Sequence, residues 1–237
     1  MYNKNAWNKY ENRDGIFSFA EGYKEFISRG KTEREVVKLA RDLCEKAGFR
    51  ELSTFQSLKP GDKVYAINKN KNVAAFIIGD KGIEEGLRVL GAHIDSPRID
   101  VKPNPLYESS DFALLDTHYY GGIKKYQWVT IPLAIYGVVC KKDGTKIEVA
   151  IGDKENDPIV GISDLLIHLS GDQMSKPASK VIEGENLDVT IGSIPLKDEK
   201  DKPVKGAILA LLKDEYGFEE EDFLSAEMKV DFVRVYR

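Results

Sequence analysis

His93 and Asp95 are the residues whose types and spacing first indicate chemistry in this sequence. One residue separates them, so on an extended backbone both side chains lie on the same face, about 7 Å apart along the strand. An imidazole binds metal ions well, and a metal-bound imidazole commonly gives its second N–H to a carboxylate or a backbone carbonyl. The pattern therefore predicts His93 as a metal ligand and Asp95 as a carboxylate that orients it.

A plainer interpretation of the pair needs no metal. His93 would then be a core histidine with satisfied hydrogen bonds, and Asp95 would cap a turn before Pro97. Short patterns of this kind carry a high risk of chance matches, so the pair by itself does not choose between the two interpretations.

The apolar run from Val89 to Ala92 stands directly before His93. Such a run predicts a buried strand, and Pro97 ends the hydrogen-bonded ladder by removing a backbone donor. In α/β enzymes, sites are usually found where strands end. We therefore expect a strand over residues 87–93 with His93 and Asp95 at its C-terminal end.

Two helices and a hairpin are expected before that strand. Residues 16–29 place apolar side chains at near-helical intervals and stop at Gly30. Thr32 and Glu35 have the spacing of a capping box, which predicts a second helix over 33–47. Strand-like runs at 63–68 and 73–79 flank a polar turn. This order is typical of the first part of an α/β metallopeptidase domain, although any α/β domain would share it.

The sequence changes character after Pro105. Strand-like runs cover 126–139, 146–152, 182–194 and 225–235, while helices are expected only at 164–169, capped by Ser163, and at 203–216, ended by Gly217. We place a domain boundary near residues 106–112. The expected organisation is α/β, with a first domain over 1–107 and a β-rich second domain over 108–237.

The composition is that of a soluble globular protein. It is 42% hydrophobic and 31% charged with a net charge of −4, so no basic excess indicates nucleic acid. No apolar run reaches the roughly 20 residues of a membrane helix, and residues 1–15 contain no secretory apolar core. We expect no nucleic-acid or membrane partner and a cytoplasmic location. Cys44 and Cys140 are expected to be buried, reduced thiols.

Longer strings around the pair carry a resemblance to a known family. AHIDSPRIDVKPNPLYE, followed by LLDTHYYGGIKKYQWVTIPLAIYG, DPIVGISDLLIHLSGDQ and DFLSAEM, strongly resembles the aspartyl aminopeptidase family of cocatalytic zinc metallopeptidases, in particular its bacterial members. The resemblance covers most of the chain. It implies removal of N-terminal aspartate or glutamate from peptides, with two zinc ions that polarise the scissile carbonyl and activate a bridging water, and a glutamate as general base.

The resemblance also implies roles for single residues. His93 would bind one zinc ion directly, and Asp95 would be the catalytic-site carboxylate that fixes its ring. His118 would reach the active site of a neighbouring subunit and bind substrate there, and the β-rich domain would mediate assembly into a homo-oligomer. Without the resemblance, the glycine- and aromatic-rich segment around His118 is equally typical of a packed loop or an interface. His168 is expected to be structural.

The family's pattern is incomplete in this sequence. Family members continue well beyond this length, with a GQDDR-like segment for the bridging aspartate, an EE pair for the base and a ligand, and a final histidine. This set of motifs does not follow DFLSAEM here. A catalytic zinc needs about three protein ligands. We therefore expect an N-terminal portion that is inactive alone. Two functions stay open: a zinc aminopeptidase completed by another polypeptide, or a non-catalytic interaction protein that associates with full-length relatives.

Overall fold

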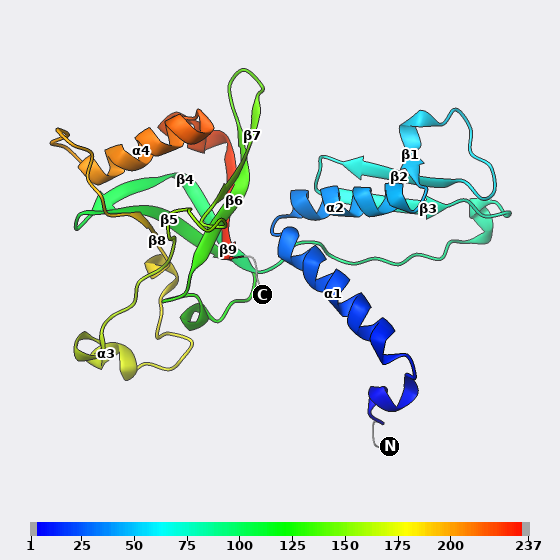
Figure 1. Cartoon of the computed structure of the whole chain (residues 1–237), viewed down its shortest axis with the longest axis horizontal. Helices are drawn as coiled ribbons and strands as arrows, with labels where there is room; N and C mark the ends of the chain where they lie inside the picture. The colour runs from blue at the N-terminus through cyan, green and yellow to red at the C-terminus, as the bar shows by residue number, and fades with distance from the viewer. Residues whose placement is uncertain (1–3, 234–237) are drawn as a thin grey trace. The chain divides into compact units, whose positions relative to one another are not determined.

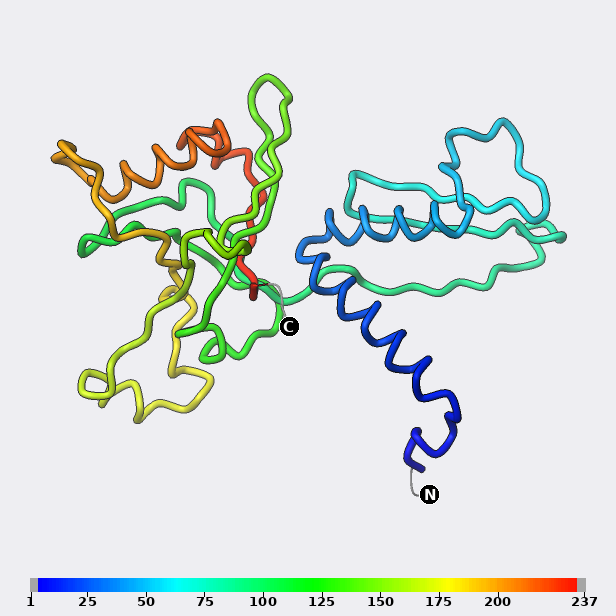
Figure 2. Tube along the Cα trace, viewed as in Figure 1, coloured from blue at the N-terminus to red at the C-terminus, as the bar shows by residue number. Residues whose placement is uncertain are grey.

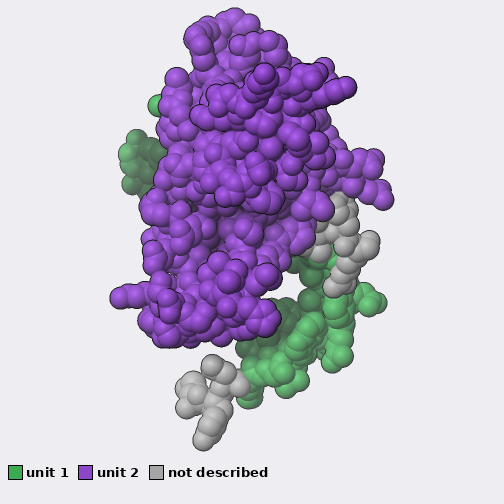
Figure 3. Space-filling model, turned by 90° about the vertical axis from the view of Figure 1, so that its left-hand side faces the viewer, with its two compact units in different colours: residues 1–95 green, residues 96–237 purple. Residues whose placement is uncertain are grey.

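The chain forms two compact units, residues 1–95 and residues 96–237 (Figure 3). The computed structural model describes residues 4–233. The boundary between the units differs from the expected one near residues 106–112, because the strand that begins at Arg98 continues to Ser109. The α/β fold class is confirmed, with helices beside a small sheet in unit 1 and a larger sheet in unit 2 (Figure 1).

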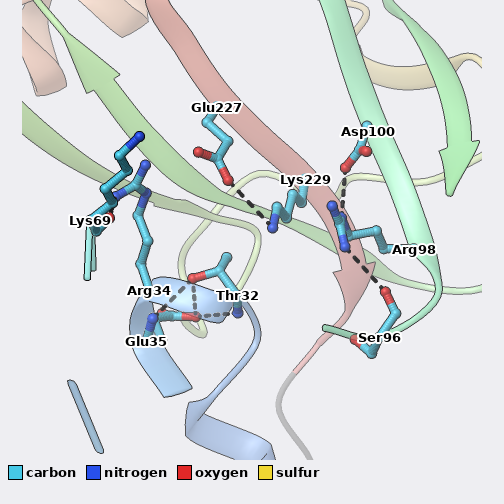
Figure 4. A network of polar contacts seen from close by, with 9 residues as sticks. All are labelled: Thr32, Arg34, Glu35, Lys69, Ser96, Arg98, Asp100, Glu227 and Lys229. Carbon is cyan, nitrogen blue, oxygen red and sulfur yellow. Dashed lines mark hydrogen bonds and ion pairs between the residues drawn. The ribbon is translucent and has the colours of Figure 1, made fainter. Parts of the chain in front are cut away.

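Helices and a hairpin build the described part of unit 1. In chain order its elements are η1 (Ala6–Lys9), α1 (Arg13–Arg29), α2 (Glu33–Lys46), β1 (Arg50–Glu51), η2 (Leu52–Thr54), β2 (Lys63–Asn68), β3 (Asn72–Ile77) and η3 (Ile83–Glu85). The sheet order is β1-β2-β3. The predicted capping box is confirmed: the Glu35 backbone N–H donates to Thr32 Oγ1, and the Thr32 N–H donates to Glu35 Oε2 (Figure 4).

Unit 1 buries little apolar surface. Among the hydrophobic side chains of residues 4–95, only Val37, Val64 and Tyr65 are buried. Phe17 and Phe19 of α1 remain exposed, although they belong to the apolar pattern that predicted this helix. A domain of this size normally buries most of its large apolar side chains in one core, which the described part of unit 1 lacks.

The prediction of a strand over residues 87–93 is wrong. Residues 86–97 contain no helix or strand, and their trace runs extended after η3 (Figure 2). Leu87 to Ala92 make no backbone hydrogen bond to any described residue. A strand exists only if a neighbour takes up its N–H and C=O groups, and the sheet of unit 1 ends at β3 without pairing to this segment.

Unit 2 is organised around a six-stranded sheet of order β7-β6-β9-β4-β5-β8. Its elements are β4 (Arg98–Ser109), β5 (Phe112–Tyr120), η4 (Lys125–Gln127), β6 (Leu133–Cys140), β7 (Lys146–Ile151), η5 (Ile167–Leu169), α3 (Gly171–Met174), η6 (Gly184–Asn186), β8 (Val189–Gly192), α4 (Pro203–Tyr216), η7 (Glu220–Ser225) and β9 (Ala226–Phe232). Leu133 of β6 pairs with Val160, and Gly161 pairs with Thr190 of β8. These bridges join β8 back to β6, so the sheet closes into a small barrel.

The barrel interior is the main core of the protein. Ile99, Leu115, Leu133, Val189 and Val230 come from five different strands and are fully or almost fully buried. Helix α4 packs against this core through apolar side chains that include Val204 and Leu212. It ends at Gly217 in the left-handed conformation, as predicted. Unit 2 therefore has a complete hydrophobic core of its own.

Two prolines lie inside β4 without ending it. The register between β4 and β5 shifts between Val101 and Leu106, so Pro103 and Pro105 fall in an irregular stretch outside the regular ladder. Asn104 between them has a φ of 53°. The prolines therefore mark a bulge within the strand, whereas the sequence suggested the end of a domain.

Other expectations for unit 2 need correction. The prediction of a helix over residues 164–169, capped by Ser163, is wrong. Residues 163–166 are irregular, and only the turn η5 and the short helix α3 follow. The long strands expected at 126–139 and 182–194 are shorter, since η4 and η6 occupy their first parts. Within residues 4–233, none of the helices has the length and apolar character needed to span a bilayer.

Candidate metal centre around His93

The His93 ring lies against the residue expected to orient it. His93 Nδ1 is 2.7 Å from the Asp95 backbone carbonyl oxygen and 3.3 Å from Asp95 Oδ1. A carbonyl oxygen can only accept, so the shorter contact places the proton on Nδ1 and leaves the Nε2 lone pair available. The His93 side chain is 82% exposed. An exposed imidazole held in this way can bind a metal ion through Nε2.

Arg98 fixes the backbone that follows the pair. Its Nε donates to Asp100 Oδ1 at 2.7 Å, and its Nη1 donates to the Ser96 carbonyl at 3.3 Å (Figure 4). Its guanidinium lies 3.9 Å from the Tyr120 ring centroid. The planar fork of arginine suits this combination of hydrogen bonds and stacking. In the string HIDSPR, the arginine thus ties the Ser96 backbone to the start of β4.

His118 lies on β5, which ends before Gly121 and Gly122. It is exposed, and its ring stacks on Tyr119 with the centroids 5.2 Å apart. Gly121, which follows the strand, has a φ of 76°, a conformation that favours glycine. The chain therefore turns at Gly121, directly after β5 has ended at Tyr120.

A row of polar side chains crosses four strands at the level of His118. His118 is in register with Asp100 of β4, Asp100 with Lys229 of β9, and Lys229 with Tyr136 of β6. Residues directly opposite each other in antiparallel strands share a face, here the face opposite the barrel core. No local pattern relates these residues, because they come from four separate segments of the chain.

Lys229 is the unusual member of that row. It is 3% exposed, and its Nζ lies 3.5 Å from Glu227 Oε1 (Figure 4). Burial lowers the pKa of Lys229 to about 8. Tyr136 is also buried, and its hydroxyl donates to Asp153 Oδ1 at 2.7 Å. No local sequence pattern singles out Lys229 or Tyr136.

The described residues do not assemble a zinc site by themselves. Across residues 4–233, no group of three or more His, Cys, Asp and Glu side chains is arranged to hold a metal ion. His93 supplies one imidazole and Asp95 one nearby carboxylate, whereas a catalytic zinc needs about three protein ligands. His168 is exposed on η5. The cysteines are free and partly buried, and burial raises the pKa of Cys44.

Comparison with known proteins identifies the family. The family described as Aminopeptidase I zinc metalloprotease (M18) matches residues 26–233, which is most of the chain. The chain belongs to the M18 family of zinc aminopeptidases. The expected resemblance to this class of metallopeptidase is thereby confirmed.

Bacterial M18 proteins are similar to this chain over nearly its whole length. It is 52% identical over 234 residues to a probable M18 family aminopeptidase 1 from Clostridium acetobutylicum, covering 96% of this chain and 50% of the relative. It is 46% identical over 230 residues to the corresponding protein of Thermotoga maritima, covering 97% of this chain and 50% of the relative. The chain thus spans about half the length of these curated relatives.

Solved M18 structures share the fold. The crystal structure of the Thermotoga maritima aminopeptidase superposes with a TM-score of 0.90 at 45% identity, covering 97% of this chain and 50% of that one. The structure of aminopeptidase I from Clostridium acetobutylicum gives a TM-score of 0.85 at 51% identity, covering 98% of this chain and 53% of that one.

Proposed function

We propose that this chain contributes part of the active site of a zinc-dependent aminopeptidase that removes N-terminal aspartate or glutamate from peptides. Membership of the M18 family supports the reaction class. The contact of 2.7 Å between His93 Nδ1 and the Asp95 carbonyl carries the proposal for this chain, because it leaves Nε2 of an exposed imidazole available as a zinc ligand. In this role Asp95 positions the ring.

We further propose that the chain alone is inactive. Zinc affinity depends on several deprotonated ligands held together, and the described residues offer His93 with one neighbouring carboxylate. The remaining ligands and the general base would then come from a polypeptide that corresponds to the half of the M18 relatives that this chain does not match. Unit 1 would be part of the catalytic domain, as first expected for residues 1–107.

Unit 2 is proposed as the oligomerisation domain that was expected over residues 108–237. Its segment around η5 exposes Leu165, Leu166, Ile167 and Leu169. Exposed apolar groups gathered in one short segment are typical of interaction sites. His118 is proposed to bind substrate in the active site of a neighbouring subunit, which its exposure on β5 allows. The free thiols Cys44 and Cys140 support a cytoplasmic location.

Hydrolysis of aminoacyl chromogenic amides tests the proposed activity. The purified chain would be assayed alone and after coexpression with the unmatched half of the Clostridium acetobutylicum relative, using aspartyl, glutamyl and leucyl substrates with added zinc. We expect turnover of the acidic substrates only by the two polypeptides together, and its loss on His93→Ala. Preferential turnover of the leucyl substrate would contradict the acidic specificity, and turnover unaffected by His93→Ala would contradict the role of His93.

A non-catalytic assembly protein is the second candidate function. The complete barrel core of unit 2 and its exposed η5 segment favour this alternative, because neither depends on a catalytic site. Mixing the chain with the full-length Clostridium acetobutylicum relative tests it. Formation of mixed oligomers without any aspartyl or glutamyl hydrolysis by the coexpressed halves would favour assembly over catalysis.

A further inference from the structure

Arg98 is a buried cation that contacts the backbone beside the candidate metal ligand. It is 8% exposed, and charged side chains are seldom buried without partners. Its Nε donates to Asp100 Oδ1 at 2.7 Å, and its Nη1 donates to the Ser96 carbonyl at 3.3 Å. The first bond pairs the charge. The second bond reaches into the irregular segment of residues 86–97, which contains His93.

The bond to Ser96 is not needed to satisfy a buried group. Ser96 is exposed, so water can hydrate its carbonyl nearly as well as a protein donor. The effect of the arginine is therefore on conformation, because it holds the Ser96 carbonyl in one direction. Pro97 adds a second restraint, since the residue before a proline is restricted to extended backbone. Rotation of the peptide between Asp95 and Ser96 is limited as a result.

The restricted peptide carries the acceptor for the His93 ring. Nδ1 of the imidazole lies 2.7 Å from the Asp95 carbonyl oxygen, which belongs to the peptide between Asp95 and Ser96. This oxygen accepts a hydrogen bond only while it points at the ring, so a restraint on the peptide also favours the tautomer with the proton on Nδ1. Of the two neutral tautomers, only this one leaves the Nε2 lone pair available for a metal ion.

The end of β5 also holds the arginine. The Arg98 guanidinium lies 3.9 Å from the Tyr120 ring centroid, and the two residues are paired in the ladder between β4 and β5. A Cβ added at Gly121 would lie 3.5 Å from Pro97 Cα, so the turn after β5 packs beside the HIDSPR string. Two hydrogen bonds and one stacked ring therefore restrict the Arg98 side chain, which is required of a group that orients another.

We propose that Arg98 is a positioning residue for His93. Its contact with the Ser96 carbonyl fixes the direction of the Asp95 carbonyl, and that carbonyl keeps the imidazole proton on Nδ1. This inference rests on the proposed function, because it concerns the same zinc ligand. A lysine would not replace the arginine, since one ammonium group cannot reproduce the planar fork that bonds two acceptors and stacks on a ring.

Nitrogen NMR of the 237-residue chain with isotope-labelled histidine tests the proposal without any measurement of activity. The nitrogen shifts of an imidazole report its tautomer, and the spectrum of His93→Ala assigns the His93 signals among those of the three histidines. At about pH 8, where an ordinary histidine is neutral, we expect the Nδ1–H tautomer to predominate on His93. An unconstrained imidazole in water prefers the proton on Nε2, so the expected result differs from that of a free ring.

Two variants of Arg98 and a matched control locate the effect. Arg98→Lys keeps the charge but not the fork, and it should lower the ratio of Nδ1–H to Nε2–H on His93 by about three- to tenfold, the range expected for loss of one hydrogen bond. Arg98→Ala should do the same, and Arg98→Lys carries the test if the alanine variant does not fold. Lys102→Ala removes another cation of β4, whose Nζ lies 2.8 Å from Asp116 Oδ1, and it should leave the ratio unchanged.

Zinc affinity gives a second readout. The chain would be coexpressed with the unmatched half of the Clostridium acetobutylicum relative, and the purified protein would be titrated with zinc. Arg98→Lys should weaken by about tenfold the zinc binding that His93→Ala removes, because groups that orient a metal-bound imidazole typically contribute about ten- to hundredfold to affinity. Lys102→Ala should leave the affinity unchanged.

Three results would overturn the proposal: an Nε2–H tautomer that predominates on His93 in the wild type, an unchanged tautomer ratio in folded Arg98→Lys, or an equal change of the ratio in Lys102→Ala. The expected tautomer change without hydrolysis of aspartyl or glutamyl substrates by the coexpressed polypeptides would support this inference and contradict the proposed activity. Hydrolysis that depends on His93, with a tautomer ratio that neither Arg98 variant alters, would do the reverse.

Discussion

The Nδ1 atom of His93 lies 2.7 Å from the backbone carbonyl oxygen of Asp95, so the closer contact to the imidazole comes from the backbone and not from the carboxylate that the sequence predicted. The Asp95 carboxylate is farther away, with Oδ1 at 3.3 Å. The backbone of Asp95 therefore sets the tautomer of His93, and its carboxylate stands close enough to stabilise the ring when a cation binds.

Zinc binding by the isolated chain should be weak and substoichiometric. Isothermal titration of the purified chain with zinc is expected to give less than one tight site, because His93 and one carboxylate provide only part of a ligand set. His93→Ala should reduce the remaining binding. His168→Ala, which changes an exposed histidine on η5, should leave it unchanged. One tight zinc per chain that is lost with His93→Ala would show that the site is more complete than we propose.

The close approach of β6 and β9 makes Gly137 sensitive to substitution. A Cβ at this position would overlap the Glu227 carbonyl oxygen and lie 2.8 Å from Met228 Cα. Gly137→Ala should therefore lower the free energy of unfolding of unit 2 by about 1–3 kcal/mol or more. Gly171→Ala is the control, since nothing lies within 4 Å of its added Cβ. Equal urea midpoints for the two variants would show that the strands can separate at little cost.

The barrel core should dominate the stability of unit 2. Leu115→Ala removes a side chain that is almost fully buried in the barrel, and it should cost about 2–5 kcal/mol in urea unfolding. The same change at Leu165, which is exposed beside η5, should alter the free energy of unfolding by no more than about 0.5 kcal/mol. A small effect at Leu115 would mean that the core relaxes around the cavity.

Burial of Lys229 should make the stability of unit 2 depend on pH in the alkaline range. Its folded-state pKa of about 8 lies below the ordinary value of 10.5, so between these values the unfolded chain binds a proton that the folded chain does not. The free energy of unfolding therefore rises as the pH increases from about 8 to 10.5. Below pH 8 the buried amine of Lys229 is charged in the folded chain, and this charge lowers the free energy of unfolding. Lys229→Met should raise the free energy of unfolding at pH 7 by about 1–3 kcal/mol, with a smaller gain at pH 10.

Urea unfolding of the wild type and Lys229→Met at both pH values measures this effect, and Lys200→Met serves as an exposed control with a pH profile parallel to the wild type. A gain that is the same at pH 7 and pH 10 would show that packing of the methionine, and not removal of the charge, explains the change.

Self-association should depend on the exposed segment around η5. Light scattering of the purified chain is expected to show a species larger than the monomer at high concentration, because the apolar side chains of Leu165, Leu166 and Ile167 are exposed there. Leu166→Asp should shift the distribution toward monomer, whereas Ile194→Asp, which changes another exposed side chain of unit 2, should not. A monomer at all concentrations would argue against an assembly role for this segment.

The sequence by itself determined the elements whose hydrogen bonds close within a few residues. Thr32 and Glu35 cap α2 as their spacing predicted, and Gly217 ends α4 in the conformation that glycine favours. The contact between His93 and Asp95 is also local, but the sequence predicted the Asp95 carboxylate as the contact, whereas the backbone carbonyl oxygen lies closer. Local signals of this kind need no information about distant segments, so composition and spacing are sufficient to find them.

The tertiary structure alone decided the pairings between distant segments. It placed His118 in one row with Asp100 and Lys229, and it closed the barrel through Val160. It also left residues 87–92 without a strand partner, although their apolar pattern is as strong as that of β2 or β3. A strand is stable only when a neighbour satisfies its backbone groups, and the sequence of a strand does not state which segment that neighbour is.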